Sequence, residues 1–159
     1  KVSGWMRQLG ETGSYTVGAE TLAKIQSGFY ADFCDDTATM QTVKKMKETE
    51  NYLSDPNSAV AFEVYHRYHA VSGDQTPTVV VSTASPYKFS ASVLTALGSE
   101  LYAQDGVNDE FEQVYQLSAL TGTQVPQPIQ ALAGKPVRFT DVTAVADMRK
   151  AVLRLAGIE

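Results

Sequence analysis

The chain has 159 residues, which is enough for one domain with a hydrophobic core. Hydrophobic residues make up 43% of it and the net charge is −5, which excludes disordered and collagen-like classes and argues against nucleic acid or an anionic membrane as the main partner. No apolar run approaches the roughly twenty residues of a membrane span, and the single cysteine fits a reducing compartment.

The first helices are predicted from N-terminal signals and apolar spacing. Residues 16–27 are predicted to form a helix with Leu22 and Ile25 facing inward. Asp35 and Asp36 begin the next helix, where two carboxylates complement the positive end of the helix dipole. Adjacent carboxylates could also bind a metal or act as acid and base. No further carboxylate or histidine lies nearby at ligand spacing, so we assign them to helix capping.

A third helix is predicted to begin at Asp55 and Pro56. Aspartate is a favoured N-cap residue, and proline suits the first helical position because its missing N–H needs no partner there. Residues 59–64 are apolar nearly all round, which indicates burial. Farther along, His66 and His69 could share one helix face, but no carboxylate or thiol joins them. We therefore predict no metal site.

Residues 78–98 are the predicted centre of the fold. They open with Val79–Val81, a β-branched run typical of a strand covered on both faces in a parallel sheet. Four small residues follow, Ser-Thr-Ala-Ser, and then Ser85 and Pro86 repeat the pattern of a cap followed by proline. Ligands in open α/β sheets bind where a strand ends and the next helix begins, so this turn is the candidate site.

The rest of the chain is predicted to be mainly helical. Prolines and glycines limit residues 129–133 to one or two helical turns, and residues 137–139 are predicted to be extended. The last helix has an apolar stripe of Val145, Met148, Val152 and Leu155. About six helices and one strand result. A strand that is apolar on both faces needs neighbouring strands, and the chain hardly supplies them. Together with the start at Lys1, this shortage predicts a piece of a longer chain.

Two segments resemble motifs of the threonine synthase family. The family motif Thr-Ala-His-Pro-x-Lys-Phe is similar to residues 82–89, Ser-Thr-Ala-Ser-Pro-Tyr-Lys-Phe. The motif Gly-Tyr-x-x-(Asp/Glu)-Pro-His-x-Ala-Val is similar to residues 52–61, Tyr-Leu-Ser-Asp-Pro-Asn-Ser-Ala-Val-Ala. Their order and separation also resemble the family's, while Ser85 and Asn57 stand where the motifs have histidine. The resemblance covers nearly the whole chain but only the last third of such an enzyme.

The resemblance implies an α/β fold. This mainly helical C-terminal fragment would contribute a buried parallel strand to the three-layer PLP-binding domain of a tryptophan-synthase-β-like enzyme, with no internal boundary in residues 1–159. It implies a cytoplasmic, pyridoxal 5′-phosphate (PLP)-dependent carbon–oxygen lyase that converts O-phospho-L-homoserine and water to L-threonine and phosphate. The implied partners are the missing N-terminal part of the same chain and the small-molecule substrate, with neither nucleic acid nor a membrane.

The resemblance also implies the site residues. PLP catalysis needs a Schiff-base lysine, a cradle for the phosphate and a partner for the ring nitrogen. Thr83 stands at the position of the family threonine whose hydroxyl donates to that nitrogen, and Ser82 and Ser85 are further cofactor-binding candidates. Lys88 is not the Schiff-base lysine, which in the family lies far upstream. It is expected to form a salt bridge, orient an anion or be solvated. We expect no catalytic residue here, and an inactive fragment.

Other functions fit the same residues. One is a related PLP enzyme of the same fold, such as a threonine dehydratase or a cysteate-forming relative, because a strand that ends in hydroxyl residues is more widely shared. Another is a freestanding helical module that holds a small anion at the Ser85 helix start. The hydroxyls of Ser82, Thr83 and Ser85 could also merely end a strand and cap a helix.

Overall fold

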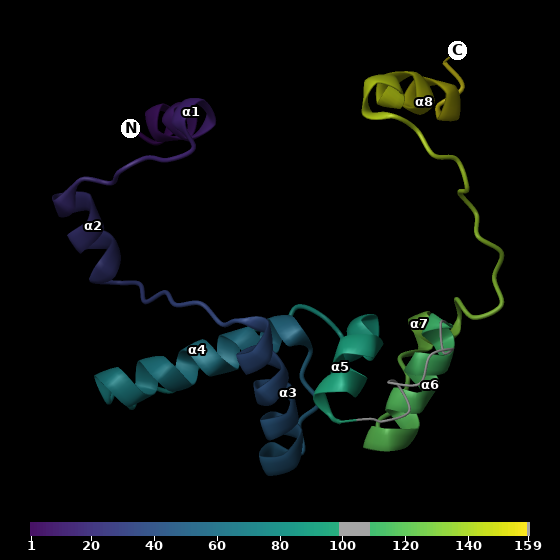
Figure 1. Ribbon diagram of the computed structural model, residues 1–159, viewed down its shortest axis with the longest axis horizontal. Coiled ribbons are helices and arrows are strands. Elements are labelled where there is room, and N and C mark those ends of the chain that lie inside the picture. Colours follow the sequence, from purple (N-terminus) through teal and green to yellow (C-terminus); the bar gives the residue numbers. More distant parts are fainter. Residues whose placement is uncertain (99–108, 159) are drawn as a thin grey trace. The chain divides into compact units, whose positions relative to one another are not determined.

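The structure is a computed structural model that describes residues 1–98 and 109–158, and every ordered element in them is helical (Figure 1). The chain divides into two compact units, Lys1–Gln124 and Val125–Glu159. The first unit contains α1 (Val2–Thr12), α2 (Ala19–Gln26), α3 (Asp36–Glu50), α4 (Pro56–Ser72), the 3₁₀ helix η1 (Pro86–Phe89), α5 (Ser90–Ala96) and α6 (Glu110–Thr121). The second contains α7 (Gln127–Gln130), the 3₁₀ helix η3 (Val145–Asp147) and α8 (Met148–Leu155).

The core of the first unit lies where four helices meet. The helix α3 packs against both α4 and α5, and α5 packs against α6 and follows directly from η1. The fully buried side chains include Val43 of α3, Leu94 of α5 and Leu117 of α6. Val43 and Met46 of α3, three residues apart on one face of the helix, are both buried.

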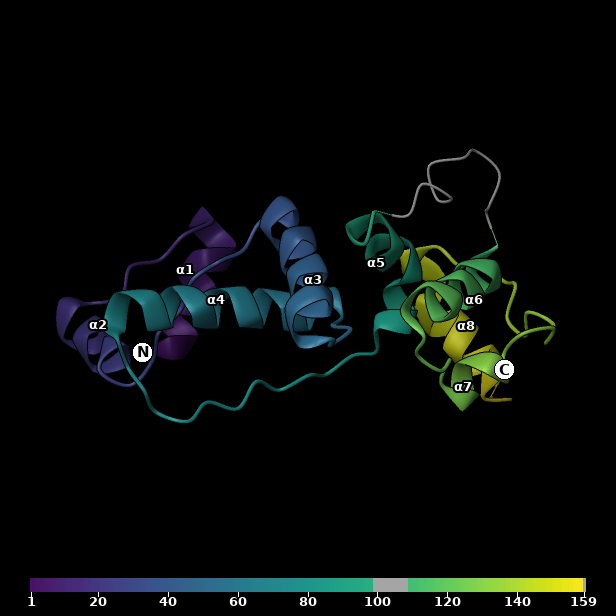
Figure 2. The same cartoon turned by 90° about the horizontal axis from the view of Figure 1, so that it is seen from below.

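The predicted buried strand is not confirmed. Residues 79–81 have no strand assignment in the structure, and the exposed fractions of Val79 and Val81 are 86% and 72%. Val80 is half-buried. Figure 2 shows this extended segment returning from the end of α4 toward the start of η1. A strand needs a neighbour for its backbone hydrogen bonds, and the described residues contain no strand that could pair with it.

The N-terminal helices differ from the prediction in packing. Residues 16–27 contain α2, which is shorter than predicted, and the region before it forms the helix α1. Neither helix has a buried residue, and the exposed fractions of Leu22 and Ile25 are 43% and 45%. Their inward orientation is therefore wrong for this chain, because no described element covers that face of α2.

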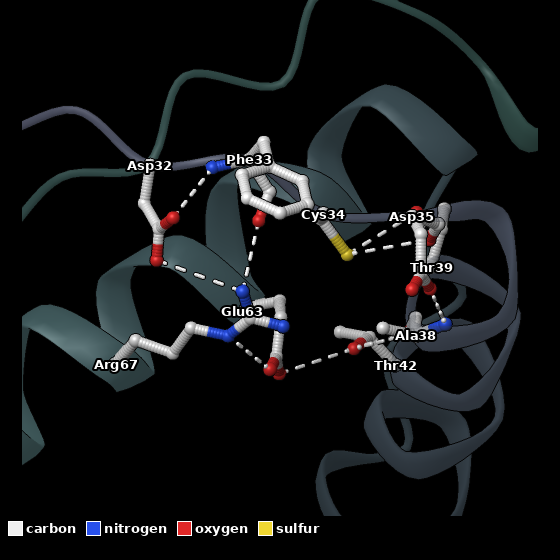
Figure 3. Close-up of polar contacts among 9 residues, drawn as sticks. All are labelled: Asp32, Phe33, Cys34, Asp35, Ala38, Thr39, Thr42, Glu63 and Arg67. Carbon is white, nitrogen blue, oxygen red and sulfur yellow. Dashed lines mark hydrogen bonds and ion pairs between the residues drawn. The ribbon is translucent and has the colours of Figure 1, made fainter.

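The segment before α3 is tied to α4 by Arg67 (Figure 3). The Arg67 guanidinium donates to the Phe33 carbonyl oxygen at 2.8 Å and to Glu63 Oε1 at 2.9 Å. It also lies 3.5 Å from Asp32 Oδ2. The hydrogen bond to Glu63 is the main reason that the pKa of Arg67 is raised. This cluster aligns the start of α3 with the middle of α4.

The second unit is small and open. Helix α7 begins two residues before the one or two helical turns predicted at residues 129–133 and overlaps them, and η3 leads into α8. The side chains of the predicted stripe, Val145, Met148, Val152 and Leu155, are all exposed. The only hydrogen bond between side chains described in this unit joins Arg154 to Asp141 at 2.8 Å.

Across the described residues, no helix combines the length and apolar character that crossing a membrane requires.

Candidate functional site

The turn at residues 82–85 is held at its end by a cap. The Ser85 hydroxyl accepts a hydrogen bond from the Tyr87 backbone N–H at 3.3 Å, as predicted for a helix N-cap. The helix that follows is not continuous, however. The element capped by Ser85 is a 3₁₀ turn of four residues, and α5 begins only at Ser90 after Phe89 leaves the helical conformation.

The N-terminus of α4 forms the second part of the site. Asp55 is the N-cap, and its Oδ1 accepts from the backbone N–H groups of Asn57 and Ser58 at 3.0 and 3.2 Å. Unlike most caps, Asp55 is buried, with an exposed fraction of 1%. Ser54 and Ser58 on either side of it are buried as well. The Ser54 hydroxyl makes no hydrogen bond within the described residues.

Side-chain hydrogen bonds join these two segments. The Ser58 hydroxyl donates to Asp55 Oδ2 at 2.5 Å, and its oxygen lies 3.0 Å from the Ser82 hydroxyl oxygen. Ser82 also lies within 3.4 Å of Asp55 Oδ2. The structure therefore brings together the two sequence segments that carried the family motifs.

Thr83 stands apart from this network. It is exposed, and its hydroxyl has no hydrogen-bond partner in the part of the chain that the structure describes. Its neighbours in the turn are both engaged, Ser82 with the start of α4 and Ser85 as a cap. Successive side chains in extended backbone point to opposite sides, so Ser82 bound to α4 leaves Thr83 directed away from it.

Sequence reasoning identified Asp55 only as a cap and missed its contact with Ser82. The available signal was the density of small hydroxyl residues around the cap, Ser54 and Ser58. It also missed Tyr87, whose hydroxyl lies 2.7 Å from Thr123 Oγ1 and donates to the Thr123 carbonyl at 2.9 Å. These bonds tie the start of η1 to the end of α6.

Other candidate residues are separate from the turn. Lys88 is exposed, and its side chain forms no hydrogen bond or ion pair with the described residues, which matches the solvated alternative. His69 Nε2 lies 3.0 Å from Gln75 Nε2, while His66 Nδ1 is buried without a described partner. No group of three potential metal-ligating side chains occurs in residues 1–98 and 109–158.

Among the described residues, the largest pKa shift lies at the opposite end of α4. Asp74 accepts from the Thr76 hydroxyl at 2.6 Å, from the Thr76 N–H at 2.9 Å and from the Tyr68 hydroxyl at 2.7 Å. These hydrogen bonds, led by the one from the Thr76 hydroxyl, lower the pKa of Asp74 to about 2. Its hydrogen bond with Asp74 raises the pKa of Tyr68.

A pocket of about 610 Å³ lies beside the extended segment, between α3 and α4. It is lined by Thr78 and Val80 together with Phe62, Tyr65 and His66 of α4. None of residues 82–85 lines it. We therefore build the candidate site on the turn and the start of α4 rather than on this pocket.

This fold also occurs in a solved enzyme structure. The chain is similar to part of a PLP-bound threonine synthase from Brucella melitensis, with a TM-score of 0.56 and 24% identity. The similarity covers 77% of this chain and 29% of that one. The fold of this chain is thus shared with a segment of that structure.

The family follows from the sequence match. Residues 58–152, more than half of the chain, match the family model described as threonine synthase, C-terminal. The chain therefore belongs to the threonine synthase C-terminal family. The match includes Ser58 and the whole turn at residues 82–85.

Relatives match over similar lengths. A threonine synthase of Schizosaccharomyces pombe is 33% identical over 99 residues, which are 62% of this chain and 19% of that protein. Threonine synthase-like 1 of Macaca fascicularis is 34% identical over 74 residues, which are 46% of this chain and 10% of that protein. The chain thus spans about a fifth or less of the length of these relatives.

Proposed function

We propose that this chain is the C-terminal part of a PLP-dependent threonine synthase, a carbon–oxygen lyase. The full enzyme would convert O-phospho-L-homoserine and water to L-threonine and phosphate, and residues 1–159 would lie within its enzyme domain. The family match and the fold shared with a PLP-bound relative support this proposal. The free Cys34 is consistent with a reducing compartment such as the cytoplasm.

The proposed cofactor contact is the Thr83 hydroxyl, donating to the ring nitrogen of PLP. The observation that carries it is the Thr83 hydroxyl, which is exposed and has no hydrogen-bond partner among the described residues, between two neighbours that are already hydrogen-bonded. Ser82 and Ser85 then shape the turn instead of approaching the ring. A threonine hydroxyl is neutral, so it can orient the ring without adding a charge.

Bound PLP would supply an electron sink for bond breaking at the substrate's α-carbon. The residues of this chain would bind one edge of the ring and hold it in place. Lys88 follows the turn in η1 and is exposed. We expect the Schiff-base lysine in the missing part of the enzyme. The piece alone should therefore be inactive.

The exposed valines fit the same proposal. Val79 and Val81 are apolar and β-branched, yet largely exposed in this chain. We propose that residues 79–81 form a buried parallel strand when the rest of the enzyme domain supplies neighbouring strands. That arrangement would place the turn at residues 82–85 at the carboxyl end of a strand, where ligands bind in α/β folds.

The test is to replace Thr83 in the full-length enzyme. Thr83→Val keeps the shape and removes the donor, while Thr83→Ser keeps a donor and serves as the matched control. The lost hydrogen bond is worth about 1.5–3 kcal/mol, so kcat with O-phosphohomoserine should fall about ten- to a hundredfold in Thr83→Val. The absorption spectrum of bound PLP should shift in Thr83→Val and not in Thr83→Ser.

Two results would contradict the proposal. Wild-type turnover and spectrum in Thr83→Val would show that the hydroxyl turn only ends an extended segment and caps a helix. Turnover of threonine or serine, with none of O-phosphohomoserine, would instead identify a dehydratase of the same fold.

A further inference from the structure

Asp55 has more contacts than a helix cap needs. One carboxylate oxygen, Oδ1, accepts both of the backbone N–H groups that a cap satisfies. The other oxygen, Oδ2, is bound to the Ser58 hydroxyl at 2.5 Å and lies 3.4 Å from the Ser82 hydroxyl. Through Oδ2, Asp55 therefore also contacts Ser82, a residue outside the helix that it caps.

The other aspartate caps of the described chain show what capping alone looks like. Asp35 at the start of α3 accepts from the Ala38 N–H, and Asp109 at the start of α6 accepts from the Phe111 N–H. Both are exposed, and among the described residues neither side chain forms a hydrogen bond or ion pair with another segment. Asp55 is buried to 1% exposure, although capping does not require burial.

Hydrogen bonds join Asp55 to the turn both directly and by way of Ser58. The Ser58 hydroxyl donates to Asp55 Oδ2 at 2.5 Å and is also placed to donate to Ser82 Oγ, 3.0 Å away. The Ser82 hydroxyl donates to the same Asp55 Oδ2 atom at 3.4 Å. Hydrogen bonds linked in this way strengthen one another, and a charged acceptor makes the first one strong.

We propose that Asp55 is a positioning residue that anchors Ser82, directly and through Ser58, and thereby presents the Thr83 hydroxyl on the opposite side of the turn. This inference rests on the proposed function, in which Thr83 contacts the cofactor. Asp55 touches neither substrate nor cofactor. Its effect on the reaction passes through the orientation of the turn at residues 82–85.

The substitution Asp55→Asn separates the two tasks. Asparagine is as good an N-cap as aspartate, so its oxygen can still accept the Asn57 and Ser58 N–H groups. Its NH₂ group replaces Oδ2 and is only a donor, so it cannot accept the Ser58 proton. Ser58→Ala is a second route to much of the same loss, because it removes the hydroxyl that bridges Asp55 and Ser82 and leaves the cap intact. Asp35→Asn is the matched control at a cap without a second task.

The first measurement is kcat of the full-length enzyme with O-phosphohomoserine, in a double-mutant cycle with Thr83→Val. A misplaced contact lowers rate steeply, so Asp55→Asn should reduce kcat about tenfold or more, with little change in KM. If it acts through Thr83, Asp55→Asn should cause little further loss in the Thr83→Val background. The same fold loss in both backgrounds, or no loss at all, would overturn the inference.

The second measurement needs neither activity nor cofactor. Amide hydrogen exchange of the PLP-free full-length protein should be about tenfold faster at residues 82–87 in Asp55→Asn and in Ser58→Ala. The same amides should be unchanged in Asp35→Asn. Unchanged exchange in both site variants would overturn the anchor. Wild-type turnover in Thr83→Val would instead remove the proposed function, while the exchange data would still decide whether Asp55 holds the turn.

Discussion

The two ends of α4 use carboxylates in different ways. At its start, the carboxylate of Asp55 is buried and connects to Ser82, 27 residues away. Just beyond its end, the carboxylate of Asp74 accepts from Tyr68 and Thr76, which lie within six residues of it. The first carboxylate holds two distant segments together, whereas the second only shapes a local turn.

The difference shows what distinguishes a site from a helix terminus in this chain. Both ends satisfy backbone groups with side chains, and both have a well-defined terminal residue, Asp55 at the start and Gly73 at the end. Only the start combines burial with a contact to a segment that is remote in sequence. We therefore expect substitutions at the start of α4 to affect stability and function together, and those at its end to affect stability alone.

The largest expected effect on stability is that of Asp55→Ala. It removes the cap and leaves the buried Ser58 hydroxyl without its acceptor, which together should lower the free energy of unfolding by about 2–4 kcal/mol. Asp35→Ala, at an exposed cap, should lower it by about 1 kcal/mol. Urea unfolding of the two variants checks the comparison. Equal losses would mean that burial of Asp55 adds nothing to its role as a cap.

A smaller effect is expected at the other end, for Gly73→Ala. Gly73 has φ of 63°, and a Cβ there would meet nothing within 4 Å, so the loss is backbone strain alone. We expect about 1–2 kcal/mol in urea unfolding. Gly73→Asn should lose less, because asparagine tolerates this conformation, as Asn51 does with φ of 50° at the end of α3. Equal losses for alanine and asparagine would contradict this explanation.

The smallest effect is expected for Asp74→Asn, and it depends on pH. Hydrogen bonds lower the pKa of Asp74 to about 2, below the value of roughly 3.9 in an unfolded chain. Its stabilisation is therefore complete above about pH 4 and is lost as the pH falls toward 2. The midpoint of thermal unfolding should fall less between pH 5 and pH 2.5 in Asp74→Asn than in the wild type. An identical fall in both proteins would show that Asp74 does not contribute in this range.

The helix starts could be predicted because their causes are local. Asp35, Asp55 and Ser85 each precede a helix within one turn, and the proline after two of them marks the first helical position. All three accept the expected backbone hydrogen bonds. The break after η1 was not predictable, because the apolar spacing of residues 89–97 fits an uninterrupted helix.

Burial was predicted less well, because it depends on what covers a face. The run Val79–Val81 and the stripe Leu22 and Ile25 have the composition of buried segments. The structure leaves most of these side chains exposed. A periodic pattern specifies which residues share a face, but it contains no information about the partner of that face.

The candidate site was predictable in its members but not in its connections. The turn at residues 82–85 and the helix start at Asp55 were both identified from sequence. The contact between Ser58 and Ser82 was not, because it depends on how the extended segment returns along α4.

The hydrogen bond between Ser58 and Ser82 has a consequence for the order of folding. It closes a loop of 24 residues, which takes about 3 kcal/mol of chain entropy from a flexible chain. A single hydrogen bond returns only about 1 kcal/mol, so it cannot form first. Only residues 51–55 separate α3 from α4, so the first contacts between these helices close a shorter loop and should form earlier. A nascent chain halted before residue 82 should therefore already contain the packed α3–α4 pair. The hydrogen bonds from Asp55 and Ser58 to Ser82 should form only after residues 82–85 have been synthesised.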